Sequence, residues 1–93
     1  MIKKVFKYNV MVADSFHLEI PIGAEILTVQ VQRGVPQIWA LVDPSLQNEV
    51  RTFRLSGTGH PVDVSDYRDD LKYIGTFQID SGYLVFHLFE RLP

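Results

Sequence analysis

The chain of 93 residues is the size of one domain, and its 46% hydrophobic and 22% charged residues are typical of a globular protein. It contains no cysteine, which excludes a disulfide framework, a thiolate zinc site and a thiol nucleophile. A formal net charge of -2 gives no field that would attract DNA or an anionic membrane, so we do not expect nonspecific nucleic-acid binding.

The N-terminal segment gives no sign of a targeting or membrane-spanning element. The basic residues Lys3, Lys4 and Lys7 precede an apolar stretch that is too short and too interrupted for a signal sequence. No apolar run approaches the length of a transmembrane helix. The lack of cysteine suits a reducing compartment. We therefore expect one domain over residues 1–93 that resides in the cytoplasm and has no membrane partner.

Two alternating segments open the chain. Over residues 2–12, aromatic and β-branched residues recur at every second position, a period that predicts a β-strand. Residues 16–20 repeat this pattern after a turn at 13–15, so we predict that the two strands form a hairpin. The lysines of the first strand could guide a phosphate, but lysine on an outer strand is more typical of protection against edge pairing.

Residues 25–43 predict a second hairpin, at the centre of the fold, with a tight turn at 33–36. The polar side of its first strand is formed by Thr28, Gln30 and Gln32. This side is either a ledge in a pocket or an ordinary solvated face. The second strand, residues 38–42, is apolar on both faces and carries the only tryptophan, Trp39. Such a strand is covered on both sides, or it faces a partner or a ligand.

The second half of the chain predicts three more strands, at residues 50–56, 71–80 and 83–89, with a hairpin turn at Asp80-Ser81-Gly82. In the first of these strands, Phe53 and Leu55 share a face with Arg51, opposite Thr52 and Arg54. In the second, one face carries Tyr73, Gly75, Phe77 and Ile79, and the other carries Ile74, Thr76 and Gln78. The third is apolar on both sides except for His87, which predicts a central or interfacial strand.

The number and spacing of these segments predict the fold class. Regular turns and almost no helix indicate an all-β domain. We expect a small antiparallel sandwich or barrel of about six to seven strands. The acidic residues 62–70 predict one long loop with at most a short helical turn.

The best candidate site is the turn Gly57-Thr58-Gly59-His60-Pro61. Two glycines let successive backbone N–H groups face an anion, so that a phosphate or a nucleotide fits such a nest, with nearby side chains as further donors. The turn lacks the ending and the following helix of a P-loop, however, and a glycine-rich strand exit fixed by proline explains the same residues. We predict a ligand site formed by Arg54, Gly57, Thr58, Gly59, His60 and Trp39.

Two aromatic or ionisable residues have competing interpretations. Trp39 could stack a base, but a single tryptophan is more typical of a core or interface anchor. His87 could be a ligand or an acid–base group, whereas a hydrogen-bonded core histidine is more common. The three histidines have no metal-binding spacing, so we expect neither a metal nor a cofactor.

Catalysis is weakly supported by the residues. Ser56, His60 and Asp63 or Asp66 contain the groups of a hydrolytic triad, but nothing in the sequence fixes their geometry. No Gly-x-Ser-x-Gly elbow is present. Asp69 and Asp70 point in different directions on most backbones and make a poor carboxylate pair. The sequence therefore favours a protein that is not an enzyme.

An ordered set of segments carries a family resemblance. The segments are Pro21-x-Gly23-Ala24-Glu25-Ile26-Leu27, Val29-Gln30-Val31-Gln32, Ile38-Trp39-Ala40-Leu41-Val42-Asp43, Gly57-Thr58-Gly59-His60-Pro61, Tyr73-Ile74-Gly75-Thr76-Phe77-Gln78 and Val85-Phe86-His87. Together, over roughly residues 7–90, they resemble a family of small uncharacterised proteins of bacteriophages and prophages. The resemblance implies a phage origin and a role in infection but supplies no chemistry. Residues 63–70 look longer than the corresponding segment of many such proteins.

These observations lead to three functional hypotheses. The first is a non-catalytic phage accessory protein, in the cytoplasm of the host cell, that binds and sequesters or blocks a host component such as a nucleotide-like small molecule or a host protein. The second is a structural or protein-interaction module that forms a homo-oligomer through its apolar strands. The third is an enzyme that acts on a phosphorylated small molecule.

Overall fold

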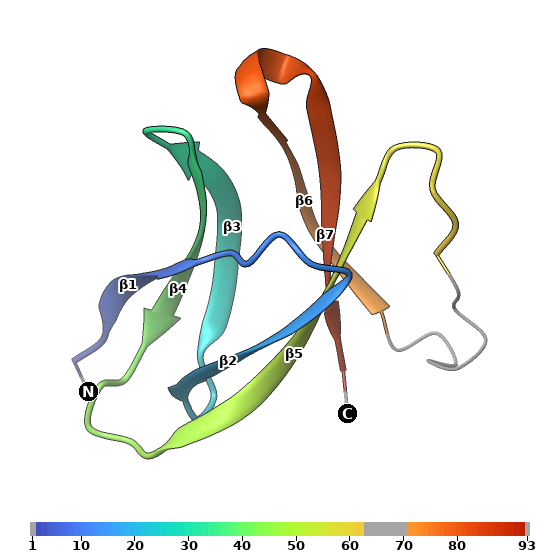
Figure 1. The fold of residues 1–93 in the computed structure, drawn as a ribbon. Helices are drawn as coiled ribbons and strands as arrows, with labels where there is room; N and C mark the ends of the chain where they lie inside the picture. Colours follow the sequence, from blue (N-terminus) through green and yellow to red (C-terminus); the bar gives the residue numbers. More distant parts are fainter. Residues whose placement is uncertain (1, 63–70, 93) are drawn as a thin grey trace.

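A computed structural model describes residues 2–62 and 71–92 and shows an all-β chain (Figure 1). Its strands are β1 (Lys4–Asn9), β2 (Ser15–Pro21), β3 (Glu25–Gln32), β4 (Val35–Val42), β5 (Asn48–Gly57), β6 (Leu71–Ile79) and β7 (Leu84–Arg91). A short 3₁₀ turn, η1 (Asp80–Gly82), joins β6 to β7. The predicted all-β class and the turn before the last strand are confirmed. The predicted loop with its helical turn falls mostly on residues 63–70, which lie outside the described residues.

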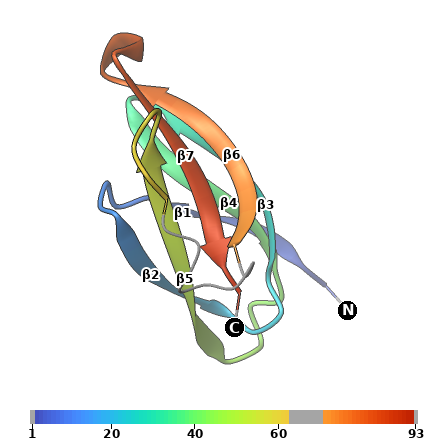
Figure 2. The same ribbon diagram turned by 90° about the vertical axis from the view of Figure 1, so that its right-hand side faces the viewer.

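The described strands form two antiparallel sheets. One sheet has the order β1-β4-β3 and the other the order β2-β5-β7-β6. Figure 2 shows β5, β6 and β7 in front of β4 and β1, so the sheets are two layers. Of the two predicted architectures, the sandwich is the one observed. No helix in the described ranges is long and apolar enough to cross a membrane.

The predicted central hairpin is confirmed as β3 and β4. Arg33 and Gly34 both have positive φ angles, 52° and 78°, as a type I′ turn requires. The turn is therefore shorter than predicted, because Val35 and Pro36 already belong to β4. As expected of a strand that is apolar on both faces, β4 is the central strand of its sheet.

The predicted first hairpin is wrong, because β1 pairs with β4 and β2 pairs with β5. The segment between them crosses from one sheet to the other instead of turning back. At its start the Val10 amide donates to the carbonyl of Pro36, and at its end Asp14 accepts from the Leu55 amide. Alternation fixes the face that a strand buries, but it does not identify the strand that pairs with it.

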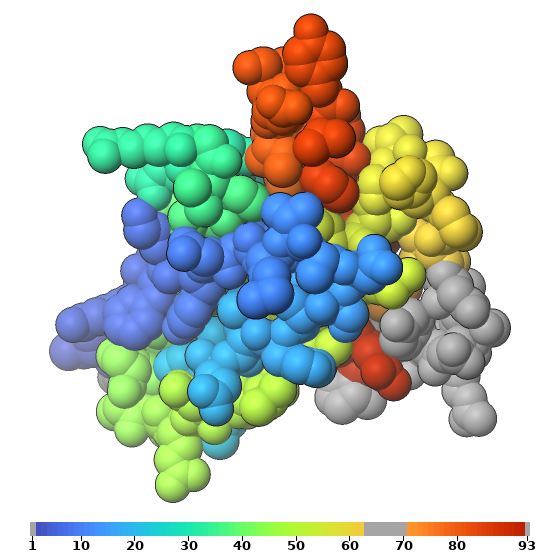
Figure 3. All heavy atoms as spheres, viewed as in Figure 1, coloured from blue at the N-terminus to red at the C-terminus, as the bar shows by residue number. Residues whose placement is uncertain are grey.

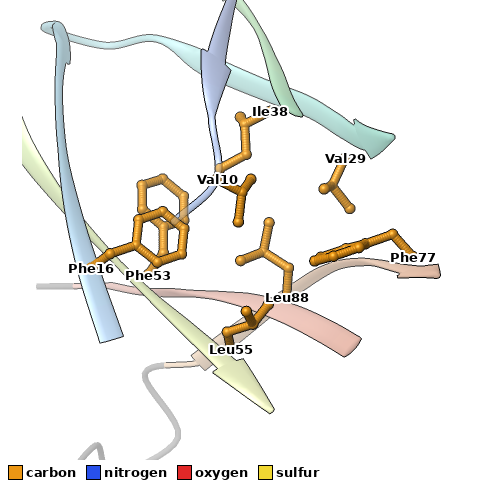
Figure 4. Packing of buried hydrophobic residues seen from close by; sticks show 8 residues of the cluster. All are labelled: Val10, Phe16, Val29, Ile38, Phe53, Leu55, Phe77 and Leu88. Atoms are coloured by element: carbon orange, nitrogen blue, oxygen red, sulfur yellow. The ribbon is translucent and has the colours of Figure 1, made fainter. Parts of the chain in front are cut away.

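The core lies between the two sheets and takes side chains from both (Figure 4). Its main cluster consists of Val10, Phe16, Val29, Ile38, Phe53, Leu55, Phe77 and Leu88. A second cluster consists of Ile20, Ala24, Ala40 and Val42. The rings of Phe16 and Phe53 stack with centroids 5.3 Å apart, which joins β2 to β5 on the buried side of their sheet.

A bulge in β6 changes which of its side chains point away from the core. Tyr73 lies opposite Phe89, whereas Gly75 lies opposite Leu88, so one residue of β6 between them has no separate partner on β7. The extra residue resets the alternation, and Tyr73 therefore shares the outer face with Thr76. The prediction that Tyr73 lies on the face of Gly75 and Phe77 is wrong for this reason.

At Gly75, β6 comes close to Val29 on β3 of the other sheet. A Cβ atom on Gly75 would lie 2.8 Å from Cγ1 of Val29, a distance at which a core side chain must move. We expect Gly75→Ala to lower the free energy of unfolding by about 1–3 kcal/mol, measured by urea denaturation. The same change should be less costly in a Val29→Ala background, where the clashing methyl group is absent. Equal costs in both backgrounds would contradict the steric explanation.

Candidate functional site

Five of the six predicted site residues lie on β5 or in the turn that follows it, and Arg54 is on the outer face of the four-stranded sheet. On β5, Phe53 and Leu55 are buried in the core, so the alternate residue Arg54 points away from it, as predicted. The pairing register places Arg54 beside Phe89 of β7, and Phe89 beside Tyr73 of β6. A cation and two aromatic rings thus form one row across three strands.

A chain of hydrogen bonds crosses the same face. His87 of β7 bonds through Nε2 to the Thr58 hydroxyl at 2.7 Å and through Nδ1 to the Thr76 hydroxyl at 2.8 Å. The Thr76 hydroxyl also bonds to the Tyr73 hydroxyl at 2.6 Å. A neutral imidazole donates from one nitrogen and accepts at the other, which the two threonine hydroxyls can satisfy. His87 is therefore hydrogen-bonded, but on the outer face of the sheet and not in the core.

In the turn over residues 57–60, two backbone amides already donate hydrogen bonds within the chain. The Thr58 amide donates to the carbonyl of Val85, and the His60 amide donates to the carbonyl of Gly57. Gly59 has a φ of +83°, as its glycine allows. Because two of the amides that the predicted nest requires are already engaged, an anion at this turn would depend mainly on side chains.

A pocket of about 270 Å³ lies where β5 ends. Its lining residues are Asp14, Arg54, Leu55, Ser56, Gly57, His60 and Pro61. The Nε atom of Arg54 is buried and has no hydrogen-bond partner within residues 2–62 and 71–92. A buried N–H group without a partner is energetically costly, so an acceptor that reached this group would lower the cost. Of the predicted set, this pocket contains Arg54, Gly57 and His60.

A second pocket of about 270 Å³ shares Gly57 and His60 with the first. It is lined by Gly57, Thr58, His60, Tyr83, Leu84, Val85 and Phe86. Thr58 therefore lines this neighbouring pocket, while Gly59 is exposed in the turn. Ser56 and His60 share the first pocket, but Asp63 and Asp66 of the hydrolytic alternative are outside the described part of the chain.

Trp39 is separated from the other predicted site residues, because it belongs to β4 in the other sheet. It is half-buried on the outer face of that sheet, and the Lys7 ammonium group lies 5.8 Å from the centroid of its ring. Lys7 also donates to Oε1 of Gln32 at 2.6 Å. The chain itself thus covers part of the ring, and Trp39 does not contribute to a site around Arg54.

A largely buried ion pair between Arg51 of β5 and Glu90 of β7 was not predicted from the sequence. Arg51 donates to both carboxylate oxygens of Glu90, from Nε at 2.5 Å and from Nη2 at 2.8 Å. Its Nη1 donates to the carbonyl of Ala24 at 2.7 Å, on the connection between β2 and β3. The hydrogen bonds to Glu90 raise the pKa of Arg51 above its ordinary value, against the opposing effect of burial. The arrangement keeps both charges paired.

Two larger pockets share this ion pair. One of about 500 Å³ is lined by Glu49, Val50, Arg51, Thr52, Glu90, Arg91 and Leu92. The other, of about 470 Å³, is lined by residues 23–27 and 72–74 together with Arg51 and Glu90. Since Arg51 and Glu90 already use their hydrogen-bonding groups on each other, the pair is better suited to holding the fold than to capturing a ligand. No group of three or more His, Cys, Asp or Glu side chains suited to a metal ion occurs among the described residues.

The comparisons with known proteins give a family without a function. A family model described as a domain of unknown function, DUF7352, matches residues 1–93. No curated protein and no solved structure matches the chain. The function must therefore be inferred from the site itself.

Proposed function

The chain belongs to the DUF7352 family, a domain of unknown function, and we propose from the site alone that it is a non-catalytic binding module for a phosphorylated, nucleotide-like ligand. The ligand would lie on the outer face of β5, β7 and β6. The resemblance to phage proteins suggests the use of such a module, namely the sequestration of a host nucleotide during infection. The observation that carries the proposal is Arg54, which lines this pocket and whose buried Nε has no hydrogen-bond partner among the described residues.

Arg54 supplies the chemistry that a phosphate group requires. A guanidinium group is charged at all physiological pH values and presents several N–H donors in a planar fork that matches phosphate oxygens. His60 lines the same pocket and adds a side-chain donor. Asp14 lines it as well, and its carboxylate opposes an anion. We therefore expect the phosphate to lie beside Arg54 and His60, away from Asp14.

The row of side chains beyond Arg54 suits the rest of a nucleotide. Tyr73 is 56% exposed, and its ring meets that of Phe89 edge to face at 5.7 Å. Neighbouring strands are about 4.8 Å apart, so Tyr73 on β6 lies roughly 10 Å from Arg54 on β5. A mononucleotide spans a distance of this order between its phosphate and its base. Stacking of a base on an exposed aromatic ring is a common mode of recognition and tolerates every base.

Thermal unfolding with added mononucleotides, cyclic nucleotides and inorganic phosphate tests the proposal. A ligand at about one hundred times its Kd should raise the Tm of the wild-type protein by about 10 °C or more. Arg54→Ala should abolish this rise, because it removes the guanidinium group that the phosphate requires. Asp14→Asn should increase it, because the opposing charge is gone. Lys72→Ala, which removes an exposed cation from β6, is the matched control and should leave the rise unchanged.

Two results would count against this function. If none of these compounds changes the Tm, the pocket does not bind phosphorylated ligands. If Arg54→Ala retains the full rise while the Lys72→Ala control also does, the ligand binds elsewhere on the protein. Consumption of a bound nucleotide that is lost in His60→Ala would instead support the hypothesis of an enzyme.

A further inference from the structure

One edge of β1 is unpaired within residues 2–62 and 71–92. The strand lies at the end of the sheet order β1-β4-β3, and among the described strands it pairs only with β4. Its six residues run opposite β4 without a register shift, and it contains no proline. Bulges, prolines and charged side chains, lysine above all, are the usual devices that keep an edge strand from pairing further. β1 has neither a bulge nor a proline but carries Lys4 and Lys7, so its backbone is open to an added strand that complements their positive charge.

The side chains of β1 are unusually exposed for such a strand. Val5, on the outer face, is 54% exposed, and Phe6, on the opposite face, is 37% exposed. Ile2, just before the strand, is 81% exposed. Figure 3 shows β1, near the blue end of the colour scale, along the surface of the molecule. A strand added to the free edge would cover apolar side chains on both faces of the sheet.

The charge of this segment differs from that of the whole protein. Lys3, Lys4 and Lys7 are three of the nine basic residues of a chain whose net charge is -2, and no acidic residue precedes Asp14. Hydrogen bonds from Ser45 are the main cause that lowers the pKa of Asp43, and the nearby charge of Lys3 adds a smaller lowering, so the charge of Lys3 is partly balanced within the chain. The free edge is thus locally positive.

We propose that β1 is the docking edge for an extended, acidic segment of a partner protein, which adds to the sheet as a further antiparallel strand. Main-chain hydrogen bonds to the free edge supply the affinity, and apolar side chains of the added segment cover Val5 and Phe6. Its acidic side chains lie beside Lys3 and Lys4. The lysines disfavour a second copy of this chain at the same edge, because two β1 strands would bring like charges together.

This surface is independent of the proposed nucleotide site. β1 belongs to the three-stranded sheet, whereas Arg54 and Tyr73 belong to the other sheet. A failure of either proposal therefore leaves the other intact. In particular, variants of Lys3 and Lys4 should show the same rise in Tm with nucleotide as the wild-type protein.

The probe is a short synthetic peptide of alternating glutamate and valine, titrated into the ¹⁵N-labelled protein and followed by NMR. We expect the largest amide shifts in residues 4–9 of β1, with smaller ones in β4. The double variant Lys3→Glu/Lys4→Glu should raise the Kd for the peptide by about tenfold or more. Added salt should also weaken binding of the peptide to the wild-type protein. Lys7 is left unchanged because its ammonium group already contacts Gln32 and Trp39.

Three controls decide the outcome. Lys72→Glu, a charge reversal on the other sheet, should bind the peptide as the wild-type protein does. A lysine-valine peptide, and the glutamate-valine peptide with N-methyl groups on alternate backbone nitrogens, should not bind. The proposal is overturned if either control peptide binds equally well or if the shifts lie outside β1 and β4. It is also overturned if sedimentation shows a dimer that the peptide dissociates, because the edge then belongs to a second copy.

Discussion

Replacing Glu90 by glutamine is expected to lower the free energy of unfolding by about 3 kcal/mol. The side chain of Glu90 is only 5% exposed, and it accepts two hydrogen bonds from Arg51. Glutamine preserves the shape of the side chain but removes its charge, which leaves the partly buried Arg51 guanidinium without its hydrogen-bonded carboxylate and with the weaker influence of Glu49. Urea denaturation followed by Trp39 fluorescence measures the loss. Glu19→Gln, on an exposed position of β2, is the matched control and should change stability by less than about 0.5 kcal/mol.

The double variant Arg51→Met/Glu90→Leu separates the charge from the packing. A buried ion pair gains little over apolar residues of similar volume, so this variant should recover most of the stability that Glu90→Gln loses. Its remaining cost should come from the hydrogen bond between Arg51 and the carbonyl of Ala24. If the Glu90→Gln protein were as stable as the wild type, water would have to reach the Arg51 guanidinium and solvate its charge, which would contradict this explanation.

The ion pair also shows how far the sequence alone can predict a contact between distant residues. The alternation of β5 places Arg51 on the face of Phe53 and Leu55, and an arginine on a core face requires an acidic or carbonyl partner. Glu90 follows the same pattern two residues after the buried Leu88. The sequence therefore indicates that each charge needs a partner, but only the pairing of β5 with β7 identifies which one.

Strand positions were predictable because a period of two is a local property. The hairpin of β3 and β4 was predictable for the same reason, since its turn lies between two adjacent alternating segments. The partners of β1 and β2 were not, because the same alternation is satisfied in either sheet. Burial of Val10 and Phe16 in one cluster between the sheets decides that arrangement, and it depends on residues far along the chain.

The same distinction between local and long-range properties applies to the candidate site. Arg54, Gly57 and His60 come together because they are close in sequence at the end of one strand. Trp39 is distant from them because the sheet to which β4 belongs is a long-range property. The contacts of His87 with Thr58 and Thr76 depend on the register of three strands and on the bulge before Gly75. The alternation of residue types along β6 does not reveal that bulge.

Replacing Phe53 by alanine is the second change with a large expected effect. Its side chain is fully buried and stacks on Phe16, in the cluster that joins the two sheets. Loss of a buried phenylalanine and the resulting cavity should lower the free energy of unfolding by about 3–5 kcal/mol. For a domain of this size, whose total stability is of the order of 5–15 kcal/mol, such a loss leaves little margin. Tyr83→Ala, at a ring that is 83% exposed, should cost less than about 0.5 kcal/mol.

Phe53 also tests whether one strand can serve two purposes. Phe53 and Arg54 are neighbours on β5, but their side chains point to opposite faces of the sheet. Phe53→Leu should cost less than Phe53→Ala because it leaves a smaller cavity. If the buried face only supports the fold, the folded Phe53→Leu protein should keep the full nucleotide-dependent rise in Tm. A folded Phe53→Leu protein without that rise, beside a responsive Tyr83→Ala protein, would contradict this division between a structural and a binding face.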